Sequence, residues 1–88
     1  MALVILPRSL SPLVPGLPHR TSVDGGTVAD VIAALDTSWP GVRDRLCDAG
    51  PSLRPHINVF VDGDTAELST PVAAGSTVHI IPAVAGGA

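Results

Sequence analysis

The spacing of apolar residues changes along the chain, and this change predicts the elements of structure. Residues 2–6, ALVIL, form a short β-branched and leucine-rich run that Pro7 closes, which predicts a strand. Residues 19–23, HRTSV, alternate weakly and lead into a turn at 24–26, DGG, which predicts a second strand. The segment 9–18 between them carries three prolines and a glycine, so we expect a loop that makes the pair a wide hairpin.

The next stretch, TVADVIAALDTSW, has the period of a helix rather than of a strand. Thr27 is placed to cap the amide of Asp30, whose carboxylate suits the positive first turn. Pro40-Gly41 ends the helix, and residues 42–50 predict one or two further helical turns that include Cys47. Four apolar residues fall on one face of the main helix: Val28, Val31, Ile32 and Leu35.

Alternation with a period of two returns in the last third of the chain. Residues 56–64 predict a strand with Ile57, Val59 and Val61 on one face and Asn58 and Phe60 on the other, followed by a turn at Asp62-Gly63. Residues 66–69 are a short edge strand at most, and 70–76 predict a loop. In the last strand, 77–82, Val78 and Ile80 share one face, and Thr77, His79 and Ile81 share the other.

This order of elements predicts an α+β fold of two layers, with one main helix covering one face of a mixed sheet of four to five strands. We expect a single domain at 1–82, in which the apolar face of the helix packs against Leu3, Ile5, Val59 and Ile80. Phe60 and Ile81 then project from the opposite face of the sheet. Unless a loop covers them, they form an apolar partner surface.

Composition and charge exclude several classes of function. The net charge is −3 and the pI about 5.3, so we expect no binding to nucleic acid or to a membrane. The N-terminal MALVIL has no basic region before it and Pro7 cuts it short, which leaves the cytoplasm as the default location. His19, His56 and His79 lie on separate segments without metal-ligand spacing, and Cys47 is the single cysteine. We therefore expect no metal, no bound cofactor and no catalytic site.

The chain finishes on IIPAVAGGA, and this segment carries the clearest chemistry. Residues 83–88 follow the last predicted strand directly, and we expect them to form a flexible tail. An end without side chains fits a narrow active-site channel, where it presents a carboxylate to the chemistry of another enzyme. Branched residues would collide with the walls of such a channel.

The whole chain resembles the MoaD/ThiS family of sulfur carriers, which have the ubiquitin-like β-grasp fold, and within it the CysO-type carriers of cysteine biosynthesis. The resemblance rests on WPGVRDRL (39–46), INVFVDG (57–63) and above all STVHIIPAVAGG (76–87). It implies that an ATP-dependent, E1-like adenylyltransferase and sulfurtransferase adenylates Gly87, beside Gly86, before sulfur replaces AMP to give a thiocarboxylate. It also implies that Ile81, Pro82 and Val84 contact partner enzymes. Phe60 is a further predicted contact residue, but this prediction rests on the alternation of its strand and not on the resemblance.

The resemblance leaves several acceptors open. The first is a PLP-dependent cysteine synthase that uses an activated serine, O-phosphoserine in this family. The second is the large subunit of molybdopterin synthase, and a thiamine or secondary-metabolite pathway is a third. A ubiquitin-like protein modifier is a different class of function. Because the chain has no lysine, such a modifier could not build chains on its own side chains. A β-grasp binding module with an inert tail is another class. Ala88 departs from the family pattern, so we expect a JAMM-type zinc protease to cleave between Gly87 and Ala88.

Overall fold

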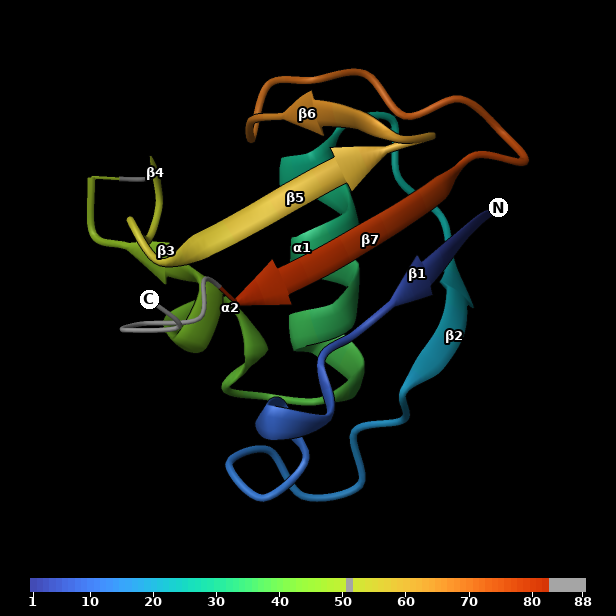
Figure 1. Cartoon of the computed structure of the whole chain (residues 1–88). Coiled ribbons are helices and arrows are strands. Elements are labelled where there is room, and N and C mark those ends of the chain that lie inside the picture. Colours follow the sequence, from blue (N-terminus) through green and yellow to red (C-terminus); the bar gives the residue numbers. More distant parts are fainter. Residues whose placement is uncertain (51, 83–88) are drawn as a thin grey trace.

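The computed structural model describes residues 1–50 and 52–82, so Pro51 and residues 83–88 lie outside the described part. A five-stranded sheet, in the order β2-β1-β7-β5-β6, forms one layer (Figure 1). Neighbouring strands are antiparallel except for the central pair, β1 and β7, which is parallel. The strands are β1 (Ala2–Ile5), β2 (Arg20–Val23), β5 (Ile57–Val61), β6 (Asp64–Ala66) and β7 (Thr77–Pro82). The predicted mixed sheet of the β-grasp type is confirmed.

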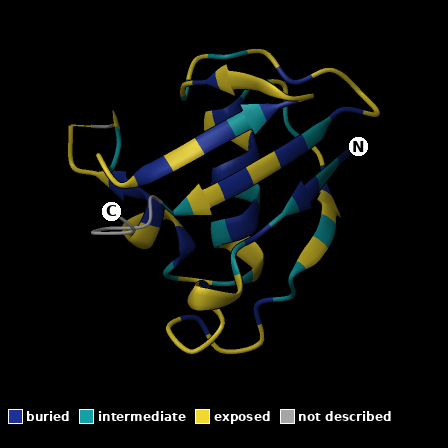
Figure 2. Cartoon of the chain, in the orientation of Figure 1, coloured by how far each residue is buried: buried dark blue, intermediate teal, exposed yellow. Residues whose placement is uncertain are grey.

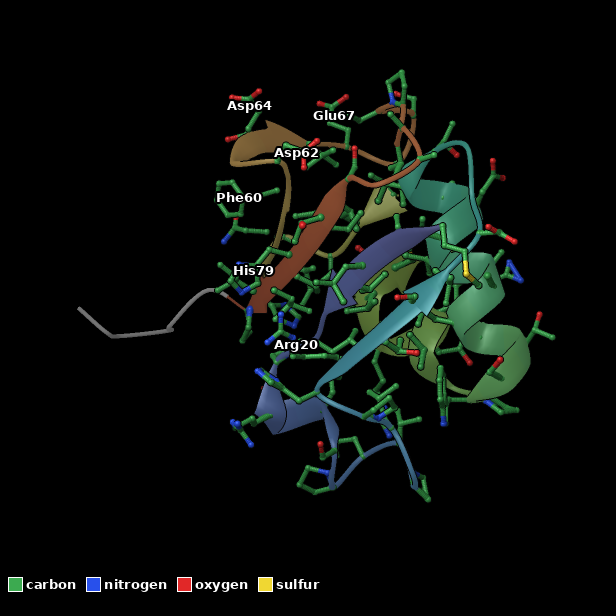
Figure 3. All side chains as sticks on the ribbon, turned by 90° about the vertical axis from the view of Figure 1, so that its right-hand side faces the viewer. Arg20, Phe60, Asp62, Asp64, Glu67 and His79 are labelled. Carbon is green, nitrogen blue, oxygen red and sulfur yellow. The ribbon has the colours of Figure 1, made fainter. Side chains whose placement is uncertain are left out.

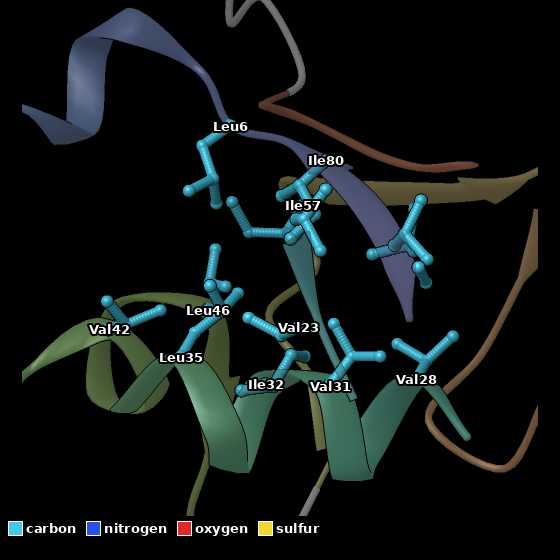
Figure 4. Packing of buried hydrophobic residues seen from close by; sticks show 14 of the residues in the cluster. Leu6, Val23, Val28, Val31, Ile32, Leu35, Val42, Leu46, Ile57 and Ile80 are labelled. Carbon is cyan, nitrogen blue, oxygen red and sulfur yellow. The ribbon is translucent and has the colours of Figure 1, made fainter. Parts of the chain in front are cut away.

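The main helix, α1 (Val28–Ser38), crosses one face of this sheet. Its start is as predicted, because the hydroxyl of Thr27 accepts a hydrogen bond of 3.2 Å from the amide of Asp30. Its end is also as predicted, since Trp39 is the C-cap residue and Pro40 follows it directly. The four apolar residues of its predicted inner face are all at most 1% exposed, and they point toward the sheet (Figure 4).

The prediction that Leu3 and Ile5 face the helix is wrong. The register pairs Val4 with Val78, and both are completely buried under α1. Leu3 and Ile5 alternate with the buried positions of β1, and each is only half-buried on the other face. Because ALVIL is apolar at every position, its sequence does not alternate, and it gives no indication of which residues of the strand face α1. The contacts assigned to Leu3 and Ile5 belong instead to Ala2, Val4 and Leu6, which are at most 2% exposed.

The one or two helical turns predicted within 42–50 are present, but they end before Cys47. The second helix, α2, spans Val42–Leu46, and the backbone of Cys47 is extended. A two-stranded ribbon of β3 (Cys47–Asp48) and β4 (Ser52–Leu53) follows it. The single cysteine therefore lies just after a helix and not within one.

Two further segments differ from their predicted form. The loop 9–18 begins within a short 3-10 helix, η1 (Arg8–Leu10), and its Leu10, Val14 and Leu17 are buried in the core. The edge strand lies two residues earlier than expected, at Asp64–Ala66, because Asp62 and Gly63 form a tight two-residue hairpin turn. Both turn residues have a positive φ, of 50° and 89°, as the type I′ turn requires.

Candidate functional site

The face of the sheet opposite α1 carries one row of side chains that crosses all five strands. The register places Arg20 beside Ile5, Ile5 beside His79, and His79 beside Phe60, with Thr65 completing the row. Residues directly opposite each other on neighbouring strands point to the same face. Figure 3 shows Phe60 and His79 on the side of the sheet away from α1. The predicted orientation of Phe60 is thereby confirmed.

Ile81 and Pro82 continue this surface toward the end of β7. Ile81 is paired with Asn58 and is 37% exposed, so it lies diagonally from Phe60 on the neighbouring strand. Pro82 is paired with Ile57 and is half-buried. None of the described segments covers this face, which shows exposed positions along the middle of β5 and β7 (Figure 2). Phe60 and Ile81 therefore form an apolar surface that no described segment covers, beside Pro82 at the end of β7.

Sequence reasoning missed two members of this group. Leu3 and Ile5, which were expected in the core, are half-buried on the same face as Phe60 and Ile81. Ile5 lies next to His79 across the parallel pair, so the apolar area extends from β5 over β7 to β1. Only the pairing register reveals this, because the ALVIL run contains no polar residue to mark the open face. We call Leu3, Ile5, Phe60 and Ile81 the open-face patch.

The residues predicted to carry the chemistry begin directly after Pro82. Val84, Gly86, Gly87 and Ala88 all lie outside the described residues, and only the position from which their segment starts is known. That position is the end of β7, which lies between β1 and β5 in the middle of the sheet. Ile81 of the open-face patch and the start of this segment thus belong to the same strand.

Asp62 stabilises the opposite end of β7. Its backbone amide donates to the carbonyl of Thr77 at 2.9 Å, and its carboxylate accepts from the amide of Thr77 at 2.9 Å. The Thr77 amide, and secondarily the Ser76 side chain, hold the pKa of Asp62 below its ordinary value. This carboxylate therefore fixes the turn to the start of β7 and has a structural role.

Cys47 and the histidines give no second centre of chemistry. Burial raises the pKa of the Cys47 thiol, an effect that the nearby Arg43 and Arg54 oppose only in part, so the nucleophilic thiolate is disfavoured. The thiol lines a pocket of about 760 Å³ between α1, α2 and the segment at Leu68. Within residues 1–50 and 52–82, no three histidine, cysteine, aspartate or glutamate side chains gather to hold a metal ion. No described helix is long and apolar enough to cross a membrane.

Comparison with known proteins identifies the family to which this arrangement belongs. Residues 13–87 match the ThiS family, and this range covers most of the chain. The chain belongs to the ThiS family. It is 33% identical over 90 residues to the sulfur carrier protein CysO of Mycobacterium tuberculosis, a match that covers 96% of each chain. It is also 38% identical over 69 residues to small archaeal modifier protein 1 of Haloferax volcanii, which covers 77% of this chain and 79% of the relative.

Solved structures of ThiS-type proteins share the fold along the whole length. The crystal structure of an Amycolatopsis orientalis BexX/CysO complex contains a chain with a TM-score of 0.88 and 30% identity, covering 99% of this chain and 100% of that one. The crystal structure of SAMP1 from Haloferax volcanii has a TM-score of 0.75 and 32% identity, with 98% of each chain covered. The ubiquitin-like β-grasp fold and the resemblance to CysO are thus confirmed, and the relatives include both sulfur carriers and protein modifiers.

Proposed function

We propose that this protein is a sulfur carrier for cysteine biosynthesis, with Gly87 as the residue that carries sulfur. The observation that supports this most is the full-length relationship to CysO, together with a Gly-Gly pair that begins four residues beyond β7, the strand that bears Ile81. The protein itself has no catalytic role in this proposal. It is a co-substrate for partner enzymes.

The proposed chemistry takes place in two steps at the carboxylate of Gly87. An E1-like enzyme joins this carboxylate to the α-phosphate of ATP, which releases pyrophosphate and gives an acyl adenylate. Hydrosulfide supplied by a sulfur donor then attacks the acyl carbon, the bond from that carbon to AMP breaks with AMP as the leaving group, and loss of a proton leaves a thiocarboxylate. A PLP-dependent cysteine synthase with O-phosphoserine is the proposed acceptor, and the thiocarboxylate displaces the phosphate from the serine carbon skeleton.

A free carboxylate on Gly87 requires cleavage of the bond to Ala88. One additional residue moves the terminal carboxylate by about 3.5 Å, whereas reactive alignment tolerates displacements below about 1 Å. We therefore propose that a JAMM-type zinc protease removes Ala88 before activation. The same enzyme class would later release the finished cysteine from Gly87.

The test compares two purified forms, residues 1–87 and 1–88, with ATP, the E1-like enzyme of the host and a sulfur donor. We expect only the form ending at Gly87 to support exchange of pyrophosphate into ATP and to gain the mass of an oxygen-to-sulfur replacement. A Gly87→Val variant of the shorter form is the matched control, because a branched terminal residue should block activation. Equal activation of both forms, with Ala88 retained, would place the reactive carboxylate on Ala88.

The acceptor is tested with the thiocarboxylate form and separate candidate enzymes. Incubation with the cysteine synthase and O-phosphoserine should give a carrier with cysteine joined to Gly87, identified by intact mass and by its release with the protease. Transfer of sulfur only to the molybdopterin synthase large subunit, or only to a thiamine or secondary-metabolite enzyme, would replace cysteine biosynthesis as the proposed pathway.

The open-face patch is the proposed docking surface for the activating enzyme. Ile81→Asp places a carboxylate in a desolvated contact, while its 37% exposure leaves the fold intact. We expect the dissociation constant for the enzyme to rise at least tenfold, which corresponds to ~1.4 kcal/mol. Ala33→Asp is the control, since it adds the same charge to an exposed position on α1, in the other layer. Equal binding by both variants would move the docking surface elsewhere.

A protein modifier is the second candidate, because small archaeal modifier protein 1 is a relative at 38% identity. In that role Gly87 would form an amide bond to lysines of target proteins. The chain has no lysine, so it could be attached singly but could not build chains on itself. A ladder of larger species on reducing, denaturing gels of host extract would favour this role, whereas a single band with a thiocarboxylate mass favours the carrier.

A further inference from the structure

The two ends of the sheet differ in their balance of charged residues within the described part. Asp62, Asp64 and Glu67 gather beyond the start of β7, where Asp24 also pairs with the N-terminal amine at 3.6 Å (Figure 3). We call the opposite end, where β7 finishes, the Pro82 end. All five arginines lie there, on segments that meet near the end of β1, the start of β5 and α2: Arg8, Arg20, Arg43, Arg45 and Arg54. Three aspartates lie among them, Asp36, Asp44 and Asp48, so arginines outnumber carboxylates at this end of a domain whose net charge is −3.

A groove of about 380 Å³ opens at the Pro82 end, on the side of α2. Its apolar part comes from Leu13, which is 51% exposed, with Leu10 and Ile57 buried behind it and Pro7 and Pro82 beside it. Its polar part comes from Arg45, Arg54, His56 and Asp44. The groove therefore joins an exposed leucine to two arginines, a histidine and one aspartate.

The basic residues that line this groove differ in whether they already form an ion pair within the protein. Arg54 forms an ion pair of 3.1 Å with Asp48 and donates at 2.7 Å to the carbonyl of Asp44. Arg45 and His56, by contrast, form no ion pair with any described residue, and both are exposed. An unpaired guanidinium next to an exposed leucine matches a partner segment that bears a carboxylate and an apolar side chain.

The reach of the chain determines which proteins come close to this groove. Residues 83–87 span at most about 18 Å when fully extended, so an enzyme that acts on Gly87 has its reactive centre within that distance of Pro82. The walls of its channel must then lie against the Pro82 end. Because Pro82 itself lines the groove, the groove borders the path by which such an enzyme approaches.

We infer that the groove of Leu13, Arg45 and His56 is a second docking site, separate from the open-face patch, for an acidic and apolar segment of the enzyme that activates Gly87. This inference rests on the proposed function, because it takes its partner from there. Charge complementarity at such a site increases the rate and specificity of encounter. The leucine contributes to how long the complex persists.

Two arginines of α2 give a matched test. Arg43 and Arg45 are both exposed on the same five-residue helix, but Arg45 lines the groove and Arg43 lines the neighbouring pocket at Cys47, which shares Asp44 and Arg54 with the groove. Arg43→Glu and Arg45→Glu therefore change the net charge equally at the same end of the molecule. We measure kcat and KM for the carrier, residues 1–87, in pyrophosphate exchange with the E1-like enzyme of the host. Arg45→Glu should raise KM about tenfold with kcat within twofold, while Arg43→Glu should raise KM by less than about twofold.

The apolar half of the groove has its own test. Leu13→Ser should raise KM several-fold with little change in thermal midpoint, because half of this side chain is already in water. Leu13→Met keeps the apolar contact and should behave like the unmodified chain. Asp44→Asn removes the one carboxylate that lines the groove and should lower KM.

Each outcome of these measurements either supports or overturns the groove as a docking site. Equal KM values for the Arg43 and Arg45 variants would show a diffuse effect of charge and overturn the groove as a docking site. Unchanged KM values for the Arg45 and Leu13 variants would overturn it as well. If the unmodified carrier supports no exchange at all, the proposed function fails, and the inference that depends on it fails with it.

Discussion

Leu35→Ala tests whether the inner face of α1 supports the fold as the structure indicates. Leu35 is 0% exposed and belongs to the core cluster between α1 and the sheet. The substitution removes three buried carbon groups, worth about 0.8 kcal/mol each in transfer free energy, and the cavity that remains adds to this loss. We expect the free energy of unfolding to fall by ~3 kcal/mol, a large share of the ~5–15 kcal/mol of a small domain.

Trp39 provides the signal for the assay. It is the single tryptophan, it is half-buried, and it packs against the same core. Urea unfolding followed by its fluorescence should show a lower midpoint with an unchanged slope, since the surface exposed on unfolding stays the same. By calorimetry the thermal midpoint should fall by ~12–24 °C, at ~4–8 °C per kcal/mol for a domain of this size.

The controls for Leu35→Ala separate burial from chemistry. Leu13→Ala removes the same atoms from a side chain that is 51% exposed, so it should cost less than ~1 kcal/mol. Leu35→Met conserves volume and should cost less than ~1.5 kcal/mol. Equal losses at positions 13 and 35 would refute the assignment of the core, because burial alone distinguishes the two sites.

Three further predictions concern the cap, the turn and the thiol. Thr27→Ala should lower the free energy of unfolding by ~1 kcal/mol and Thr27→Ser should restore it, because the hydroxyl caps the Asp30 amide. Since folding lowers the pKa of Asp62, its contribution to stability is present above the unfolded pKa and lost as the pH falls through the folded pKa. Asp62→Asn should therefore weaken the acid dependence of urea unfolding, and an unchanged pH profile would contradict this. Burial raises the pKa of Cys47, so its contribution is lost as the pH rises through the folded pKa. At mildly alkaline pH the native thiol should react with Ellman's reagent far more slowly than in urea, and equal rates would contradict its burial.

The helix and the two later strands could be predicted because their large apolar residues follow a clear period. In α1, alanines and Asp30 separate the large apolar residues, which fall on one face, and in β5 and β7 every second residue is buried. The capping threonine and the Asp62-Gly63 turn also carry their own local signals. Local chemistry and tertiary structure agree at these places, so pattern alone was enough.

The first strand and the end of α2 could not be predicted, for different physical reasons. In β1, every residue is apolar, so only pairing with β7 decides that Val4 and not Leu3 faces α1. At Cys47, the side chain of Arg54 donates two hydrogen bonds to the carbonyl of Asp44, and the amide of Arg54 donates to the carbonyl of Leu46. These contacts from a segment that follows the ribbon secure the end of α2, and nothing in residues 42–50 indicates them.

The parallel pairing of β1 and β7 explains why the groove lies where residues 83–88 begin. Because the two strands run in the same direction, the chain leaves β1 at Pro7 on the same end of the sheet at which β7 finishes at Pro82. The segment after β1 therefore has to lie beside the last residue of β7, and its inner residues, Leu10, Val14 and Leu17, hold it to the core. Leu13 points outward from this anchored segment. A substitution at Leu13 therefore changes the surface beside Pro82 without altering the sheet, which is why this position suits a test of the proposed docking groove.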